Sequence, residues 1–389
     1  MKIAVLKESR SGESRVALAP ESCKKLVQAG YAVSIESGAG GAAYYTDDAY
    51  REAGATVETD PAAMAGSAEI VLKVNAPAVD AAGRDEVRWM RPGTIVVGSL
   101  MPLRNLDAVR ALADRRITAF STDAAPRTTR AQAMDTLSSM ANITGYKGTL
   151  IAATELGKYF PMFMTAAGTV LPARVFVIGA AVAGLQAIAT ARRLGANVIA
   201  TDVRPEVKEQ IESLGGKYVG VDLKESASAG GGYARELSEA DKVRQRELLA
   251  EQCAAADVVI TTALIGGVMA PRLITADMVR RMRPGSIIVD LGADGGGNCE
   301  LSRLGESVVE SGVRIIAPLN LPATMPTHAS LLFSRNLTAF IRTFTKDKAF
   351  MLDISDDIQK ASIITHQGEI LHAKAREAIE RARESEVRR

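Results

Sequence analysis

The stretch "RVFVIGAAVAG", from Arg174 to Gly184, decides the fold of this chain. A run of β-branched and aromatic residues leads into Gly179, two alanines and then Gly184, and an alanine-rich helical pattern follows. A G-x-G-x-x-G dinucleotide fingerprint lies at such a strand–turn–helix position, and here Ala181 replaces the middle glycine. Gly179 permits the tight turn, Gly184 lets the helix pack closely on the strand, and the first N–H groups of the helix face a pyrophosphate. The pattern predicts dinucleotide contacts from Gly179, Ala180, Ala181, Val182 and Gly184, with the Ala181 methyl group narrowing the approach of the backbone to phosphate.

The next strand, "NVIATD", ends in Asp202, about 20 residues beyond Gly179. A carboxylate there accepts hydrogen bonds from an adenosine ribose and repels a 2′-phosphate, so it favours NAD(H) over NADP(H). Arg204 allows two interpretations, a ligand of a 2′-phosphate or a surface cation near the adenine. We predict NAD(H), with Asp202, Val203 and Arg204 beside the adenosine.

Strand and helix patterns alternate outward from this turn in both directions. The strands "KIAVL", "AVSIE", "AEIVLKV" and "TIVVGSL" precede it, and "ADVVITTAL" and "SIIVDLG" follow it, in the order of βαβ units around a parallel sheet. "MRPGTIVVGSL" at Met90 and "MRPGSIIVDLG" at Met282 repeat one turn and strand, although two unrelated Rossmann-like turns can agree by chance. With 389 residues available, we predict an α/β protein of two Rossmann-like domains, each a mostly parallel sheet with flanking helices, joined by long helices.

Two long helical patterns set the expected domain limits. Residues 131–160 form the first pattern, and "ASLLFSRNLTAFIRTF" after Pro326 forms a second that returns the chain to the first domain. The expected first domain is therefore discontinuous, residues 1–137 and 328–389, and the NAD(H)-binding domain comprises residues 138–327. Within the latter, the long polar, Gly-rich segment 224–247 predicts either a mobile lid over nucleotide or a solvated excursion followed by a helix.

Composition excludes several classes of function. A formal charge of +2 and an aromatic content of 4% provide neither the basic surface nor the stacking platform of a nucleic-acid-binding protein. Cys23, Cys253 and Cys299 are far apart and match no metal-ligand spacing, which predicts inert, reduced thiols and no metal site. The N-terminus soon turns polar, unlike a signal peptide, and no segment offers the roughly 20 strongly apolar residues of a membrane span. We expect a cytoplasmic chain.

A polar stretch, "APRTTRAQAMDTLSSMAN" from Ala125 to Asn142, contains no histidine, lysine or cysteine. A helix that begins at Ala131 would place Gln132, Asp135 and Ser138 on one broad face. Such a face orients an amide, a ribose or a diphosphate without exchanging protons, which suits hydride transfer directly between two nicotinamides. The alternative is a helix cap whose polar residues face solvent, and the pattern alone does not separate the two.

A dehydrogenase acting on a hydroxy or amino acid would need an acid–base group beside its substrate. The three histidines, His328, His366 and His372, lie in a turn or near the C-terminus and are expected to be structural. Lys73, at the end of the strand "EIVLK", is the best lysine candidate. Its alternative role is a strand-end cation that faces solvent.

The chain resembles the NAD(H)-binding component of the proton-translocating NAD(P)+ transhydrogenase family over nearly its whole length. The resemblance rests on "KESRSGESRVAL", "PRTTRAQAMDTLSSMAN", "FPMFMTAAGTVLPARVFVIGAAVAGLQAIATARRLGA", "ATDVRPEVKEQIESLGGK", "AGGGYARE", "TTALI" and "GGGNCEL". It implies a homodimer that binds NADH and passes hydride to NADP+ on a partner subunit, coupled to proton translocation through a membrane-spanning partner. It also implies attachment to the cytoplasmic face of the inner membrane through those partners, without a membrane span in this chain.

The resemblance also assigns residues. The implied catalytic residues are Arg127, Gln132, Asp135, Ser138 and Tyr233. The implied cofactor contacts, besides the glycine turn and residues 202–204, are Arg127, Thr128, Thr129, Gln132, Ser138, Gly232, Gln245 and Leu264. Two departures from the family pattern are Ala181, which would loosen pyrophosphate binding, and "ALIGGVMAP", which replaces a sequence bearing Pro-Gly-Lys.

Alanine dehydrogenase, a related class with the same architecture and a similar "KE…RVAL" opening, is the alternative. Its lysine has a counterpart in Lys73, but "GSLMPLRN" at Gly98–Asn105 lacks the histidine expected there. A third possibility is a non-catalytic NAD sensor.

Overall fold

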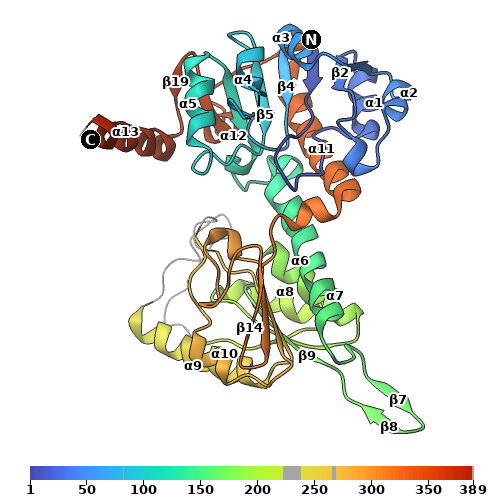
Figure 1. Cartoon of the computed structure of the whole chain (residues 1–389), viewed down its shortest axis with the longest axis vertical. Coiled ribbons are helices and arrows are strands. Elements are labelled where there is room, and N and C mark those ends of the chain that lie inside the picture. The colour runs from blue at the N-terminus through green and yellow to red at the C-terminus, as the bar shows by residue number, and fades with distance from the viewer. Residues whose placement is uncertain (82, 222–237, 265–268, 388–389) are drawn as a thin grey trace. The chain divides into compact units, whose positions relative to one another are not determined.

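The computed structural model describes residues 1–81, 83–221, 238–264 and 269–387, which form two compact units (Figure 1). Unit 1 comprises Met1–Met140 and Pro322–Arg389, and unit 2 comprises Ala141–Leu321. Each unit is built on one large sheet with helices around it. The expected limits of independently folding domains, after residues 137 and 327, stay a prediction.

The sheet of unit 1 has the strand order β19-β18-β6-β5-β4-β1-β2-β3. Strands β1 to β6 run parallel, and β18 and β19 are antiparallel additions at one edge. The order changes direction between β1 and β4, where Ile3 lies opposite Ile70. The strands are β1 (Lys2–Val5), β2 (Ala32–Glu36), β3 (Thr56–Glu58), β4 (Ile70–Leu72), β5 (Ile95–Gly98), β6 (Thr118–Ser121), β18 (Ile363–His366) and β19 (Glu369–Ile370).

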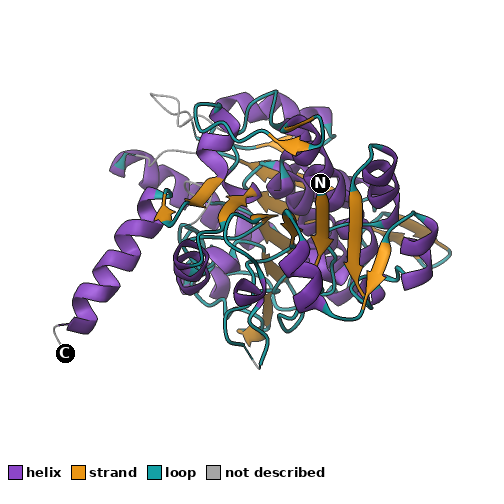
Figure 2. Cartoon of the chain, turned by 90° about the horizontal axis from the view of Figure 1, so that it is seen from above, coloured by secondary structure: helices purple, strands orange, loops and turns teal. Residues whose placement is uncertain are grey.

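Helices cover both faces of this sheet because successive side chains of a strand point to opposite faces. In and just after β1, Ile3 and Val5 belong to the core that includes α1, α2 and α11, whereas Ala4 and Leu6 belong to the core that includes α3, α5 and α13. Helix α13 extends away from the rest of unit 1 (Figures 1 and 2). The helices are α1 (Pro20–Gln28), α2 (Asp47–Glu52), α3 (Pro61–Ser67), α4 (Glu86–Trp89), α5 (Leu106–Asp114), α11 (Pro326–Thr343), α12 (Asp357–Ser362) and α13 (Ala373–Val387), with a small hairpin β16 (Thr345–Lys346) and β17 (Ala349–Phe350) after α11.

The sheet of unit 2 has the order β11-β10-β9-β12-β13-β15-β14, and all its strands are parallel except β14. Its order changes direction between β9 and β12, which is the switch point at whose carboxyl edge ligands bind in open α/β sheets. The two faces again alternate, since Val175 and Val177 pack in one core and Phe176 and Ile178 in the other. The strands are β9 (Arg174–Ile178), β10 (Asn197–Thr201), β11 (Lys217–Tyr218), β12 (Val258–Thr261), β13 (Ile287–Asp290), β14 (Ser307–Glu310) and β15 (Val313–Ile316).

Helix α6 (Thr136–Glu155) begins in unit 1 and ends in unit 2. The other helices of unit 2 are α7 (Val182–Arg193), α8 (Lys208–Ser213), α9 (Glu239–Ala255) and α10 (Ala276–Arg280). A separate hairpin, β7 (Phe163–Thr165) and β8 (Gly168–Val170), extends away from the body of unit 2 (Figure 1). No helix in the described ranges is both long enough and apolar enough to cross a membrane.

The predicted fold of two Rossmann-like, mostly parallel sheets with flanking helices is confirmed. The prediction of one helix from residue 131 to residue 160 is wrong at both ends, because α6 spans only Thr136–Glu155. The expected loop 224–247 is also wrong in its last third. Residues 239–247 are the first turns of α9, which Ser238 caps by accepting a hydrogen bond from the backbone N–H of Asp241. Residues 224–237 lie outside the described residues.

Candidate functional site

The glycine turn joins strand β9 to helix α7. Gly179 has a φ of +91°, a conformation that glycine adopts without strain. A Cβ atom added to Gly184 would lie 1.9 Å from the carbonyl oxygen of Gly179, so no other residue fits there. Ala181 is the N-cap of α7 and offers no side-chain acceptor, so the first N–H groups of the helix have neither an intrahelical nor a capping partner. This arrangement fits a pyrophosphate at the helix N-terminus.

The neighbouring strand ends are tied to this turn. The Thr262 hydroxyl, just after β12, donates to the Gly179 carbonyl oxygen at 2.9 Å. Asn298 is buried; its Oδ1 accepts from the backbone N–H of Ala263 at 3.1 Å, and its Nδ2 donates to the Ala263 carbonyl at 2.9 Å. Asp290, at the end of β13, is also buried and accepts from the Thr261 hydroxyl at 2.9 Å. The carboxyl edge of the sheet is therefore one rigid framework.

The sequence pattern marked these strand ends but not the roles of Thr262, Asp290 and Asn298. A polar residue directly after a run of buried strand residues is the signal that could have found them, because a buried polar group must find a partner.

Asp202 follows β10 and faces the glycine turn. Its Oδ2 accepts from the backbone N–H of Ala180 at 2.7 Å and from Arg204 Nη2 at 2.8 Å. Its Oδ1 accepts from the backbone N–H and the Nε of Arg204, both at 2.9 Å. A ribose hydroxyl would share this carboxylate with Arg204.

The alternative of Arg204 as a surface cation is wrong, because Arg204 is only 7% exposed and is paired with Asp202. Hydrogen bonds to Asp202 also raise the pKa of Arg204 above its usual value. Sequence position alone could not show that the two side chains face each other.

The other predicted contacts of unit 2 are spread over several elements. Val203 is half-buried after β10, Gln245 is half-buried on α9, and Leu264 is 36% exposed after β12. Gly232 and Tyr233 lie outside the described residues. The cofactor roles of all these residues stay predictions.

In unit 1, the expected helical face of Gln132, Asp135 and Ser138 is wrong. Residues Gln132–Met134 form the 3-10 turn η3, and the chain leaves helical geometry at Asp135, whose ψ is 89°. Asp135 then caps α6: its Oδ1 accepts from the backbone N–H of Ser138 at 2.8 Å and its Oδ2 from the Ser138 hydroxyl at 2.6 Å. A carboxylate that satisfies the free N–H groups of a helix start outcompetes continuation of the helix.

The same loop still presents polar groups to solvent. Arg127, Thr128, Thr129 and Gln132 are exposed, whereas the intervening Ala131 and Met134 are buried. The helix-cap alternative therefore accounts for Asp135 and Ser138, and a surface available for orienting a ligand remains on the other four.

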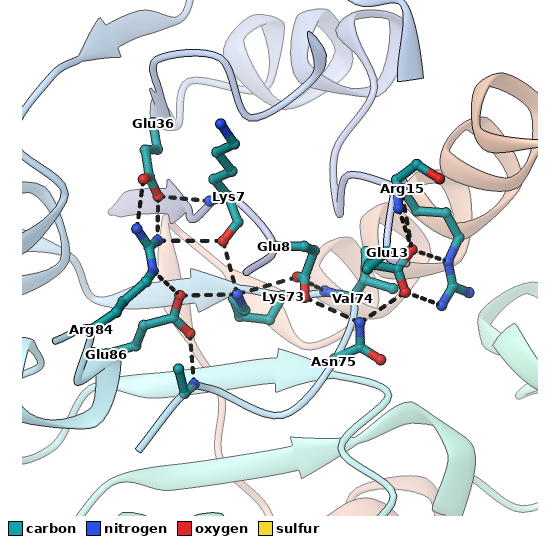
Figure 3. A network of polar contacts seen from close by, with 12 residues as sticks. Lys7, Glu8, Glu13, Arg15, Glu36, Lys73, Val74, Asn75, Arg84 and Glu86 are labelled. Carbon is teal, nitrogen blue, oxygen red and sulfur yellow. Dashed lines mark hydrogen bonds and ion pairs between the residues drawn. The ribbon is translucent and has the colours of Figure 1, made fainter. Parts of the chain in front are cut away.

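Lys73 is the centre of a buried polar network at the carboxyl edge of the sheet of unit 1 (Figure 3). Its Nζ donates to the carbonyl oxygen of Lys7 and to Glu86 Oε1, both at 3.1 Å, and lies 3.4 Å from Glu8 Oε1. Lys73 is 1% exposed, so the alternative of a solvent-facing cation is wrong.

Glu8 and Glu86 are as deeply buried as the lysine that they contact. Glu86 also accepts from Arg84 Nε at 2.7 Å. Burial raises the pKa of Glu8, and the charge of Lys73 opposes this shift. The network is closed on itself, because every proton of the Lys73 ammonium faces an acceptor of the protein.

The three histidines are placed outside both predicted sites. His366, at the end of β18, lies 2.9 Å through Nδ1 from the Thr118 hydroxyl. His372 accepts through Nδ1 from the backbone N–H of Ala375 at 3.1 Å, and burial lowers the pKa of His372. His328 is exposed in the first turn of α11.

The three cysteines are buried. Burial raises the pKa of both Cys23 and Cys253 to about 12. Across the described residues, no group of three or more His, Cys, Asp or Glu side chains is placed to hold a metal ion.

The fold and the glycine turn together define a Rossmann-like protein of the dinucleotide-binding class. The N-terminal domain model of the alanine dehydrogenase/PNT family matches residues 4–144, and the C-terminal domain model matches residues 148–373. The chain belongs to the alanine dehydrogenase/PNT family.

Individual relatives place it within this family. A chain of NAD(P) transhydrogenase subunit alpha from Rhodospirillum rubrum is 47% identical over 376 residues, which cover 96% of this chain and 98% of that protein. The crystal structure of transhydrogenase from Sinorhizobium meliloti is 44% identical, with a TM-score of 0.86, and covers 95% of this chain and 100% of that one. Alanine dehydrogenase 2 of Staphylococcus aureus is 27% identical over 339 residues, 85% of this chain and 84% of that protein.

The resemblance to transhydrogenase is thereby confirmed, with alanine dehydrogenase as a more distant relative. The family implies NAD(H) binding, and transhydrogenase, an oxidoreductase, is confirmed as the enzyme class.

Replacing Ala181 with glycine should tighten NADH binding. The change removes the methyl group beside the expected pyrophosphate position, and glycine is at least as good an N-cap as alanine. One improved hydrogen bond of about 0.5–1.5 kcal/mol corresponds to a dissociation constant about 2–10-fold lower, measured by fluorescence titration. Ala19→Gly is the control, because Ala19 is also an N-cap without a side-chain hydrogen bond, at α1. Unchanged or weaker NADH binding in Ala181→Gly would show that the methyl group does not limit the phosphate contact.

Proposed function

We propose that this chain is the NAD(H)-binding subunit of a proton-translocating NAD(P)+ transhydrogenase. Bound NADH supplies the hydride, which passes directly to NADP+ held by a partner subunit, coupled to proton translocation across the membrane. The chain itself binds and orients the dinucleotide.

The observation that carries the proposal is the closed network around Lys73. Oxidation of an amino acid requires a group that exchanges a proton with the substrate. Lys73, the best lysine candidate for that role, is directed at Lys7, Glu8 and Glu86, and no histidine lies in the Gly98–Asn105 segment. Transfer between two nicotinamides needs no such group, because only a hydride moves.

The polar loop of unit 1 suits this chemistry. Arg127 and Gln132 are exposed and offer hydrogen-bond donors for a nicotinamide amide or a ribose, while Asp135 and Ser138 fix the start of α6. Groups that orient without titrating are those that a hydride transfer between bound rings requires. In the proposal, Arg127, Gln132, Asp135, Ser138 and Tyr233 act at the nicotinamide.

The site in unit 2 suits the adenosine and pyrophosphate. The start of α7 would face the pyrophosphate, and Asp202 would accept from the ribose hydroxyls of NAD(H). NADP(H) would be bound by the partner subunit.

The proposal includes a homodimer, which the β7–β8 hairpin supports. Met164 is 80% exposed and Leu171 is 77% exposed. No charged residue occurs from Pro161 to Ala173. An isolated two-stranded hairpin is at best marginally stable, and exposed apolar surface of this kind marks an interaction site.

We further propose that the chain works at the cytoplasmic face of the inner membrane. It would be attached there through the NADP(H)-binding and membrane-spanning subunits, and would contribute no membrane span.

The proposed function is tested by mixing the purified chain with an isolated NADP(H)-binding component and following reduction of an NADP+ analogue by NADH. Transfer is expected only when both components are present. NADH binding without transfer would contradict the proposal, and would favour an NAD sensor. Alanine-dependent reduction of NAD+ by the chain alone would favour an amino-acid dehydrogenase.

Placing a charge on the hairpin should dissociate the dimer. Met164→Asp and Leu171→Asp each put a carboxylate into the proposed apolar contact, and light scattering after size-exclusion chromatography should report a monomer. Met351→Asp, at a 51% exposed methionine in unit 1, should stay dimeric. A dimer that persists in both hairpin variants would place the interface elsewhere.

A further inference from the structure

The loop from Arg127 to Asp135 is held from the C-terminal segment of unit 1. Arg130 donates through Nη2 to Asp356 Oδ2 and, at 2.6 Å, to Asp357 Oδ1. Asp356 is itself fixed, because it caps α12 by accepting from two backbone N–H groups at 3.0 Å each. One guanidinium shared between two carboxylates therefore restrains the backbone at residue 130.

A second contact restrains the loop three residues further on. Asn336, on α11, donates through Nδ2 to the carbonyl oxygen of Ala133 at 2.8 Å and is 8% exposed. Its Oδ1 is buried and has no hydrogen-bond partner among the described residues. An unpaired buried acceptor costs about 1–3 kcal/mol, which an apolar residue at this position would avoid. The bond to Ala133, and not the packing of α11, therefore explains an amide at residue 336.

The two contacts lie on either side of Gln132. Ala131 and Met134 are buried in the core that also contains Phe333 and Phe340 of α11, whereas Gln132 is exposed. A single 3-10 turn is weak by itself, so the orientation of Gln132 depends on these tertiary contacts.

We propose that Arg130 and Asn336 are positioning residues for hydride transfer. They act through the loop backbone and hold Gln132 in the orientation that the nicotinamide requires, so the inference rests on the proposed function. An exposed ion pair contributes only about 0–1 kcal/mol to stability, and Arg130 is 53% exposed. Displacement of an orienting group by about 1 Å, in contrast, can slow a reaction about 100-fold.

The test compares Arg130→Gln and Asn336→Leu with a matched control, Arg51→Gln. Arg51 forms a similar exposed ion pair with Asp48, at 2.6 Å, on α2 of the same unit. Asn336→Leu removes the unpaired acceptor together with the donor, and the Ala133 carbonyl belongs to an exposed residue that water can reach. Loss of stability is therefore not expected from either variant.

Four quantities are measured in the full chain: the single-turnover rate of hydride transfer with the isolated NADP(H)-binding component, the dissociation constant of NADH, the thermal midpoint, and amide hydrogen exchange of residues 128–135. In Arg130→Gln and Asn336→Leu the transfer rate should fall about 10–100-fold and the loop amides should exchange faster. NADH binding and the thermal midpoint should match those of Arg51→Gln. Arg130→Lys, which keeps one charge-assisted hydrogen bond, should partly recover the rate.

Wild-type transfer rates and unchanged loop exchange in both variants would overturn the inference. A loss of transfer that parallels a loss of thermal stability would also overturn it, because the two residues would then be only structural. A wild-type chain that transfers no hydride contradicts the proposed function and this inference together, whereas a competent wild type with unaffected variants contradicts the inference alone.

Discussion

The close approach of helix α7 to the end of strand β9 is the constraint on which the nucleotide site depends. Gly184 leaves no room for a Cβ atom, because that atom would lie 1.9 Å from the Gly179 carbonyl oxygen. Gly145 of α6 is similarly confined, since its Cβ atom would lie 2.0 Å from the Ala183 carbonyl. The start of α7 is thus fixed on two sides by glycine, and its free N–H groups and the adjacent Asp202 face the carboxyl edge at the switch point of the sheet.

Unit 1 has a different character, because its ionisable groups are committed to structure. Lys73 is enclosed by Glu8 and Glu86, and His372 caps α13. The loop that presents exposed polar groups, at Arg127 and Gln132, has no side chain suited to exchanging a proton near neutral pH. Together these features favour a protein that holds a dinucleotide in place and leaves bond making to the bound cofactors.

Features set by the local backbone could be predicted from the sequence, and features set by distant partners could not. The glycine turn and the carboxylate after β10 follow from a strand–turn–helix pattern within one segment. The break at Asp135 follows from competition between a cap and a continuing helix, which the pattern left open. The burial of Lys73 depends on Glu8 and Glu86, and the pairing of Arg204 depends on the geometry of a loop, so neither is visible in composition or periodicity.

The central claim is that hydride moves directly from one nicotinamide to the other without an acid–base group of this chain. The most direct measurement follows deuterium from NADH labelled at C4 of the nicotinamide, in a mixture with the NADP(H)-binding component. Direct transfer predicts that the label appears in the reduced NADP product, with no loss to water and no uptake of deuterium when unlabelled NADH reacts in D2O. Release of the label to solvent, or incorporation from solvent, would contradict direct transfer.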